Sequence, residues 1–406
     1  MPSHPDLALA WDEHEWQPKG PPVATSRGSA SLAGKPYRAA VTPRISQIPF
    51  HLDPGVAAAA EDARAEITRF DAELSNTFSE EFAPFAAVLL RTESSSSSQI
   101  ENITAGSRAL ALAELGLTRY GSNAQLVVAN VDAMQRAIDL AGDVTPEAIG
   151  AIHEALMRGQ GHADPGIFRS EQVWIGGGDA SPHNATFVPP HHDRVRAALD
   201  DLCVFVTRTD LPLIAQAAIA HAQFETIHPF NDGTGRTGRA LVHAMLKHGR
   251  ATTRTTVPIS AGLLSNTDTY FDALTAYRNG DPNPIIARFS DASFAAVNNG
   301  RELADDLTAI YDGWRKKLTA RSDSVAWRIL PILISQPAVT SKLIQERTGV
   351  SQPAVDRALR QLVSDGIATS KNEHGQDQKR DIVWRSDEAI AALDGFADRA
   401  RRRRNN

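Results

Sequence analysis

The stretch HPFNDGTGRTGR, residues 228–239, lies between two segments of helical composition. LPLIAQAAIAHAQFETI precedes it, with Asp210 as the expected N-cap and Pro212 in the first turn. A second helix is expected over about Thr237–Lys247. Because similar helical patterns recur from residue 54 to residue 312, the sequence predicts a mainly α protein in which a glycine-rich loop joins two helices.

Several interpretations compete for this loop. Gly233, Gly235 and Gly238 match G-x-G-x-x-G, but the preceding segment is a helix rather than a strand, and no acidic residue stands about 20 residues later. A Walker A loop needs Gly-Lys-Ser/Thr, which this stretch lacks. A plain turn between helices does not account for one His, one Asp and two Arg within twelve residues.

The residue types of the loop fit the transfer of a nucleotide phosphate. Glycines let backbone N–H groups approach a phosphate closely, and the N-terminus of the following helix favours an anion. Arg236 and Arg239 add positive charge in a geometry suited to phosphate oxygens. Asp232 offers a hard oxygen ligand for Mg²⁺, and His228 can accept a proton near neutral pH. Together these groups predict transfer from a nucleoside triphosphate to a hydroxyl group.

The loop also resembles the signature of Fic-domain proteins, H-x-F-x-[DE]-G-N-G-R-x-x-R. Thr234 stands where that family usually has Asn, and it keeps a hydroxyl donor with a shorter reach. The resemblance extends over about residues 40–300 and implies a helical core with a short β-hairpin flap. The matching positions are His228, Pro229, Phe230, Asp232, Gly233, Gly235, Arg236 and Arg239.

The resemblance implies a protein adenylyltransferase, which transfers AMP from ATP to a Ser, Thr or Tyr hydroxyl of a target protein or of the chain itself. In such an enzyme His228 is the catalytic base, Asp232 holds the Mg²⁺, and Arg236 and Arg239 hold the β- and γ-phosphates. The implied nucleotide-binding residues are Gly233, Thr234, Gly235, Arg236, Thr237, Gly238, Arg239 and, on the adenine side, Tyr270.

Two further segments resemble regulatory and docking parts of the same family. PGIFRSEQVWIGG and ATFVPPHHDRV resemble the flap, where residues 172–175 and 186–188 are β-prone and flank a turn. The implied target-docking residues are Val173, Trp174 and Ile175. SSQIENI resembles the inhibitory motif [S/T]-x-x-x-E-[G/N], satisfied by Ser97, Glu101 and Asn102. By this resemblance Glu101 pairs with Arg239 and takes away the anchor of the γ-phosphate.

Changes in composition and in helical pattern along the sequence predict several consecutive parts. A helix is expected over about residues 80–91, before the serine run Ser94–Ser98. Two short helices around a Gly turn, followed by a polar hairpin, indicate a winged helix-turn-helix near the C-terminus. The expected parts are a loosely ordered arm (1–40), a helical region with the inhibitory motif (41–115), the Fic core (116–300), a connecting helix (301–322) and the winged helix-turn-helix (323–406).

Composition narrows the setting. The 406 residues carry a formal charge of −6, and no apolar run approaches the ~20 residues of a membrane span. The N-terminus has no signal-peptide pattern, and the one cysteine, Cys203, excludes a disulfide or Cys-based zinc framework, so a cytoplasmic protein is expected. Residues 323–406 hold 14 Lys and Arg against 11 Asp and Glu, a net of +3 that leaves −9 for the remainder.

Other functions stay open at this point. The same site could remove AMP or transfer a different nucleotide, and the winged helix could make the chain a DNA-binding regulator through Gln352, Arg357 and Arg360. A homodimer is expected from the family resemblance. His153-Glu154 resembles half of a zincin motif with Met157 at the partner position, His191-His192-Asp193 is most simply a polar helix start, and His221 is interpreted as structural.

Overall fold

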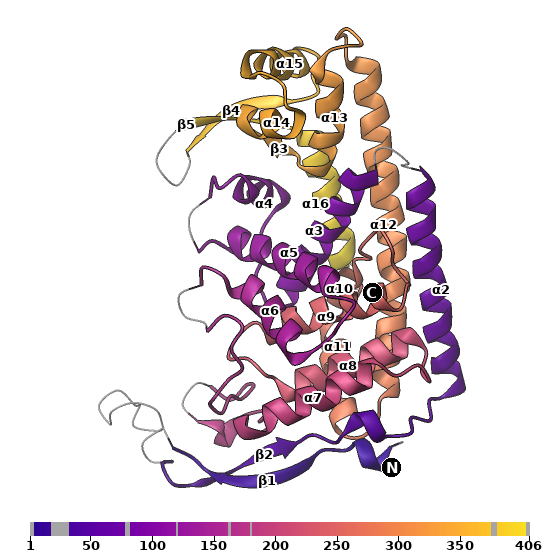
Figure 1. Cartoon of the computed structure of the whole chain (residues 1–406), viewed down its shortest axis with the longest axis vertical. Coiled ribbons are helices and arrows are strands. Elements are labelled where there is room, and N and C mark those ends of the chain that lie inside the picture. Colours follow the sequence, from indigo (N-terminus) through magenta and orange to yellow (C-terminus); the bar gives the residue numbers. More distant parts are fainter. Residues whose placement is uncertain are drawn as a thin grey trace. The chain divides into compact units, whose positions relative to one another are not determined.

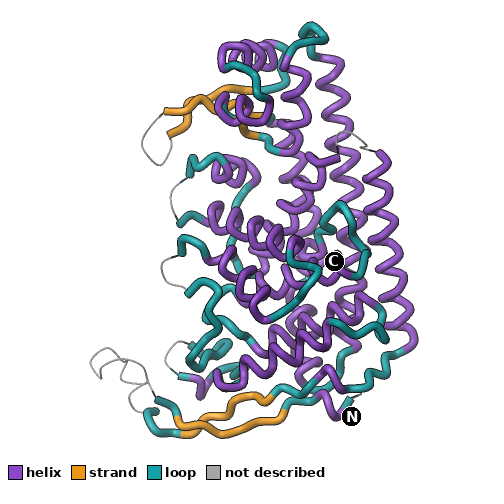
Figure 2. Tube along the Cα trace, in the orientation of Figure 1, coloured by secondary structure: helices purple, strands orange, loops and turns teal. Residues whose placement is uncertain are grey.

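The computed structural model describes residues 4–17, 32–77, 82–118, 121–160, 164–178, 181–374 and 380–402. Helices dominate this part of the chain, and the strands are confined to the pair β1–β2 and the group β3–β5 (Figures 1 and 2). The prediction of a mainly α protein is therefore confirmed. None of the described helices combines the length and the apolar character that crossing a membrane requires.

The chain divides into two compact units, each assembled from segments that are discontinuous in sequence. The first unit contains residues 1–61, 136–248 and 268–289. Its elements are η1 (Pro5–Leu7), β1 (Ala10–Glu15), β2 (Pro36–Val41), η2 (Ile45–Gln47), α6 (Pro146–Met157), η3 (Pro182–Asn184), η4 (His192–Arg194), α7 (Val195–Val206), α8 (Leu213–Ile227), α9 (Thr234–His248) and, apart from its first residue, α11 (Thr267–Arg278).

The second unit contains residues 62–135, 249–267 and 290–406, and three helices have residues in both units: α2 (Pro54–Thr77), α5 (Asn123–Asp139) and α12 (Asn283–Lys317). The remaining elements of the second unit are α3 (Phe82–Ile100), α4 (Ser107–Glu114), α10 (Ile259–Leu264), α13 (Val325–Ser335), β3 (Ala338–Val339), α14 (Ser341–Thr348), α15 (Gln352–Ser364), β4 (Thr369–His374), β5 (Arg380–Arg385) and α16 (Asp387–Arg402).

The N-terminal segment is more regular than the loose arm that we expected for residues 1–40. Strands β1 and β2 pair antiparallel, with Ala10 opposite Val41 and Glu15 opposite Pro36. Residues 18–31 of the expected arm lie outside the described residues. The ribbon is held by an apolar cluster in which residues far apart in sequence meet, so local composition could not predict it. The buried members are Trp16, Tyr37, Ala39 and Val188.

Helix α8 is buried along its whole length, which explains its Ala-rich composition. The helix begins at Leu213 with Pro212 at the N-cap position, so the expectation that Asp210 caps it is wrong. Asp210 instead binds Arg208 through two bonds of 2.9 and 2.6 Å. The ion pair competes successfully because a charged guanidinium is a stronger partner for a carboxylate than a backbone N–H.

Helix α3 continues through the serine run rather than ending near residue 91. The hydroxyl groups of Ser94 and Ser98 donate to the carbonyl oxygens of Leu90 and Ser94, both at 2.9 Å, so they satisfy themselves within the helix. Glu93, which is fully buried, accepts hydrogen bonds from the N–H and the hydroxyl of Ser260 at 2.8 and 2.5 Å. These bonds join α3 to the first turn of α10 within the second unit.

The C-terminal segment contains, in order, α13, β3, α14, α15, β4 and β5, and its antiparallel sheet has the strand order β3-β5-β4. Gln352, Arg357 and Arg360 are exposed on α15. This order of helices and strands is the one that we expected of a winged helix-turn-helix, and the assignment, together with binding of DNA, stays a prediction.

Candidate active site

The loop between α8 and α9 begins with an unusual backbone conformation. His228 caps α8 with φ 49° and ψ 64°, in the left-handed region, while its N–H donates to the carbonyl oxygen of Phe224 at 2.9 Å. Histidine is among the non-glycine residues that adopt this region more often than most. The reversal ends α8 and starts the loop at the residue that the sequence predicted as the catalytic base.

Arg169, which the sequence analysis did not single out, holds this end of the loop. Its side chain is almost fully buried, and its backbone N–H donates to the carbonyl oxygen of Pro229 at 2.9 Å. Burial lowers the pKa of Arg169 to about 10, so the guanidinium stays charged at neutral pH. That guanidinium donates to the carbonyl oxygens of Glu171 (2.8 Å), Pro190, Ile227 (3.3 Å) and His228 (2.7 Å).

His153 on α6 supports the other end of the loop. Its Nε2 lies 3.0 Å from the carbonyl oxygen of Asp232, and its Nδ1 accepts the N–H of Gly166 at 3.0 Å, which assigns the proton to Nε2. The ring stacks on Phe230 with centroids 3.6 Å apart. Burial lowers the pKa of His153 to about 4, so the ring is neutral at pH 7. Both ring nitrogens are in hydrogen bonds, so His153 positions the loop.

Asp232 and Gly233 shape the start of α9. The Asp232 carboxylate accepts the N–H of Gly233 at 2.6 Å and lies 3.4 Å from Nη2 of Arg236. The Asp232 side chain is half exposed, which leaves room for a hard cation to reach a carboxylate oxygen. Gly233 has φ +77°, and a Cβ there would lie 3.0 Å from both Leu156 Cδ2 and Met157 Sδ, so only glycine fits.

The first turn of α9 directs several predicted residues into the protein. Arg236 and Arg239 are almost completely buried, and Thr237 is fully buried. Gly238 lets α9 approach α8, since a Cβ there would lie 2.9 Å from Cδ1 of Phe224. The N-terminus of α9 opens on this loop, and the N–H groups and dipole of a helix N-terminus suit an anion.

His221 and Tyr270 form a buried pair beside this turn. Nε2 of His221 lies 2.7 Å from the Tyr270 hydroxyl, and the Tyr270 side chain is 1% exposed. Burial, and then the charge of Arg239, lower the pKa of His221 to about 3. The pair is a packing element, as we expected for His221. The predicted adenine contact of Tyr270 stays a prediction, and the structure places its hydroxyl on His221.

The flap is a single β-bridge rather than the hairpin of two strands that the sequence predicted. The bridge pairs Ile175 with Phe187, through N–H to carbonyl bonds of 2.8 and 3.2 Å. Ile175 is exposed, whereas Val173 and Trp174 are half-buried, and the Trp174 indole N–H donates to the carbonyl oxygen of Gly178 at 2.8 Å. The turn cannot extend the pairing because its glycines adopt positive φ angles.

The predicted inhibitory motif occupies the end of α3 in the second unit. Ser97 is fully buried in the helix, and Glu101 and Asn102 are exposed. Asn102 has φ 61°, and the N–H of Ile103 donates to the carbonyl oxygen of Ser98 at 3.0 Å, a common way for a helix to end. Glycine and asparagine tolerate this conformation best, which explains physically why the motif ends in one or the other.

Comparison with known proteins bears on this geometry. A model of the Fic/DOC family matches residues 143–246, which run from just before α6 into the last turn of α9. Residues 143–246 of this chain are therefore a Fic domain. The Fic match therefore includes His153, Arg169 and the whole loop 228–239. In the described structure, His153 and Arg169 contact the two ends of this loop, all within the first unit.

Similar proteins carry the same family name. The chain is 29% identical over 156 residues to the protein adenylyltransferase Fic of Aedes aegypti, covering 37% of this chain and 28% of that protein. It is 29% identical over 185 residues to the protein adenylyltransferase Fic of Nematostella vectensis, covering 42% and 39%. The chain thus spans well under half the length of these relatives.

A solved structure has a similar fold. The crystal structure of a Fic family protein from Desulfovibrio desulfuricans G20 superposes with a TM-score of 0.53 at 23% identity, covering 84% of this chain and 98% of that one. The similarity extends beyond the family match at residues 143–246 and supports the helical fold of the chain as a whole.

Replacing Arg169 by glutamine is expected to loosen the Fic loop. The variant leaves several buried carbonyl oxygens without their charged donor, which costs about 2–4 kcal/mol of unfolding free energy. Urea unfolding followed by circular dichroism measures it, with the exposed Arg158→Gln as the matched control. Equal stability of the two variants would show that the Arg169 contacts do not hold the loop.

The neutral state of His153 predicts a pH dependence of stability. Below its ordinary pKa of 6.5 the unfolded chain binds a proton on His153 that the folded protein does not bind until about pH 4. The unfolding free energy therefore falls as the pH decreases from 6.5 to 4, by up to about 1.4 kcal/mol per pH unit for this residue. The His153→Gln variant, which keeps an N–H donor, is expected to show a shallower slope. His51→Gln, at an exposed position, serves as control, and identical slopes in all three proteins would contradict the assignment.

Proposed function

We propose that the chain is a protein adenylyltransferase that transfers AMP from ATP to a Ser, Thr or Tyr hydroxyl of a protein. One observation carries the proposal: a single loop of the Fic domain contains His228 at the C-cap of α8 and Asp232 just before α9, and Arg236 and Arg239 follow within α9. The adenylyltransferases from mosquito and sea anemone support the same reaction at the level of the family.

The proposed reaction is an in-line displacement at the α-phosphorus. The target oxygen bonds to the α-phosphorus, its proton passes to the His228 imidazole, and the bond to the bridging oxygen breaks so that pyrophosphate leaves. Backbone N–H groups of Thr234, Gly235 and their neighbours in the first turn of α9 stabilise the charge of the phosphates. Because Gly233 already donates to Asp232, we assign its role to the turn rather than to a phosphate contact.

Asp232 fits the Mg²⁺ that accompanies ATP, since its half-exposed carboxylate is a hard oxygen ligand beside the phosphate cradle. The ion would offset the negative charge of the pyrophosphate. Arg236 and Arg239 are proposed to hold the β- and γ-phosphates. Their burial fixes these long side chains, so less side-chain entropy is lost when the nucleotide binds.

The flap is proposed to present the target. Ile175 is exposed and uses its N–H and carbonyl in the bridge to Phe187, which holds the segment extended. An extended segment of a target can dock against such an edge through main-chain bonds that tolerate many sequences. Regulation is proposed to follow the family pattern, in which Glu101 pairs with Arg239 and keeps ATP from binding productively.

The His228→Ala variant is expected to lose label transfer almost completely, by at least about 100-fold, because no other group takes the proton from the attacking hydroxyl. The full chain is incubated with Mg²⁺, a lysate and either α-labelled or γ-labelled ATP, and proteins are separated and counted. Label from the α-position alone supports AMP transfer. The exposed His51→Ala variant should behave as wild type, and unchanged transfer by His228→Ala would refute the assigned base.

The Glu101→Gly variant is expected to raise self-modification, by about 10-fold or more, because Arg239 becomes available to the γ-phosphate. The Glu101→Gln variant tests the charge alone and should change activity in the same direction. Glu61→Gln, at an exposed position in α2, is the matched control. Mass spectrometry of the purified chain after incubation with ATP measures the added AMP, and equal occupancy in wild type and Glu101→Gly would sink the inhibitory role.

A further inference from the structure

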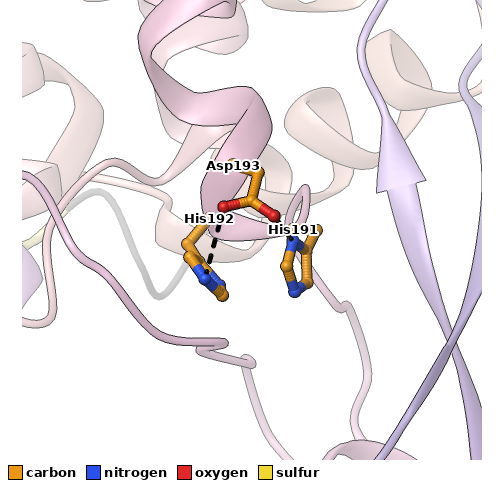
Figure 3. A group of neighbouring side chains, drawn as sticks. All are labelled: His191, His192 and Asp193. Carbon is orange, nitrogen blue, oxygen red and sulfur yellow. Dashed lines mark ion pairs between the residues drawn. The ribbon is translucent and has the colours of Figure 1, made fainter.

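A second cluster of metal-binding side chains lies outside the nucleotide loop. His191, His192 and Asp193 follow the flap directly and start η4, just before α7. Figure 3 shows the Asp193 carboxylate between the two imidazole rings. Oδ2 lies 3.1 Å from Nδ1 of His191, and Oδ1 lies 3.5 Å from Nε2 of His192.

These separations are those of ligand atoms around one small cation. Two ligands at ~2.0–2.1 Å from a tetrahedral Zn²⁺ lie roughly 3.3–3.4 Å apart. The ligand atoms of all three residues lie within 4.8 Å of one another, which is close enough for them to share one ion. Two imidazoles with one carboxylate suit zinc, cobalt or nickel rather than Mg²⁺ or Ca²⁺, which prefer oxygen ligands alone.

Neighbouring groups restrict the movement of the cluster. The ring of His14 on β1 stacks flat on His191, with centroids 4.3 Å apart and an interplanar angle of 6°. The Asp12 carboxylate lies 3.0 Å from His14 Nε2 and accepts from Arg194 at 2.7 Å, so a second contact joins β1 to η4. A site whose ligands are already oriented loses less entropy when an ion binds.

We propose that His191, His192 and Asp193 bind one divalent transition-metal ion of the zinc class at the base of the flap, beside His14 of β1. The three residues do not belong to loop 228–239, so the proposed ligands differ from Asp232, which would hold Mg²⁺. Three protein ligands leave one position for water. The inference does not depend on the adenylyltransferase proposal, because it concerns binding of the metal alone.

Binding of Zn²⁺ to the full chain tests the site directly. The protein is treated with a chelator, dialysed, and titrated with Zn²⁺ against a chromophoric zinc indicator. Wild type is expected to bind one equivalent more than the His191→Gln/His192→Gln double variant, or to bind it at least about 10-fold more tightly. His51→Gln controls for the loss of an exposed histidine. Any zinc held elsewhere on the chain is common to all proteins, so equal stoichiometry and affinity in wild type and double variant would overturn the proposal.

A second measurement keeps the test valid if the double variant does not fold. Asp193→Asn changes a side chain that is 77% exposed, and it removes the charged ligand without disturbing packing. Its zinc affinity should fall at least about 10-fold. Zn²⁺ should also raise the melting temperature of the wild type relative to chelator, and not that of Asp193→Asn, because only a native-state site stabilises by mass action. A simple ion-pair cluster instead predicts no zinc-dependent difference between the two proteins, which would refute the site.

Discussion

The geometry of the loop depends on two buried side chains that bind its backbone. The guanidinium of Arg169 donates hydrogen bonds to the carbonyl oxygens of Ile227 and His228, and Nε2 of His153 donates to that of Asp232. A loop at a helix junction presents carbonyl groups that water would otherwise satisfy, and such a loop is mobile. Here the buried guanidinium of Arg169 and the neutral imidazole of His153 take the place of water. The loop carbonyl groups and the two side chains thus satisfy each other's hydrogen bonds. Neither Arg169 nor His153 touches a reacting atom, yet the position of His228 and Asp232 follows from both.

Close packing of α8 on α9 is the second constraint. Gly238 faces Phe224 and His221, and any side chain there would force the two helices apart. The first turn of α9 would then move with its N–H groups, which form the proposed phosphate cradle. The motif therefore needs its glycines for helix packing as well as its charged residues for the proposed chemistry. The same reasoning applies to Gly233, where both the left-handed backbone and the contact with Met157 exclude a side chain.

Sequence reasoning succeeded where the controlling interactions are local. Helix, loop and helix around residues 228–239 follow from composition and glycine positions within one short window. Arg169 was missed because its partners lie up to 59 residues away, and the contact of His153 with the loop was missed because its partner lies 79 residues away. The serine run was predicted to lie outside α3 because serine has a low helix propensity. In the structure, burial of α3 against α10 and hydroxyl bonds within the helix outweigh that low propensity. Strands β1 and β2 depend on Val188, far along the chain.

The short segment Pro189-Pro190-His191 connects these constraints to the flap. Gln172 donates to the carbonyl oxygen of Pro189 at 2.9 Å, and Arg169 donates to that of Pro190, while His191 stacks on His14 of β1. The two prolines lack N–H donors and have a fixed φ, so the backbone of this segment has little conformational freedom. A change in the cluster at His191 can therefore reach the carbonyl of His228 through only Pro190 and Arg169. The Arg169 guanidinium donates to Glu171 before the flap, to Pro190 before η4 and to His228 in the loop. An interaction that orders the start of η4 therefore also restricts the flap and the loop.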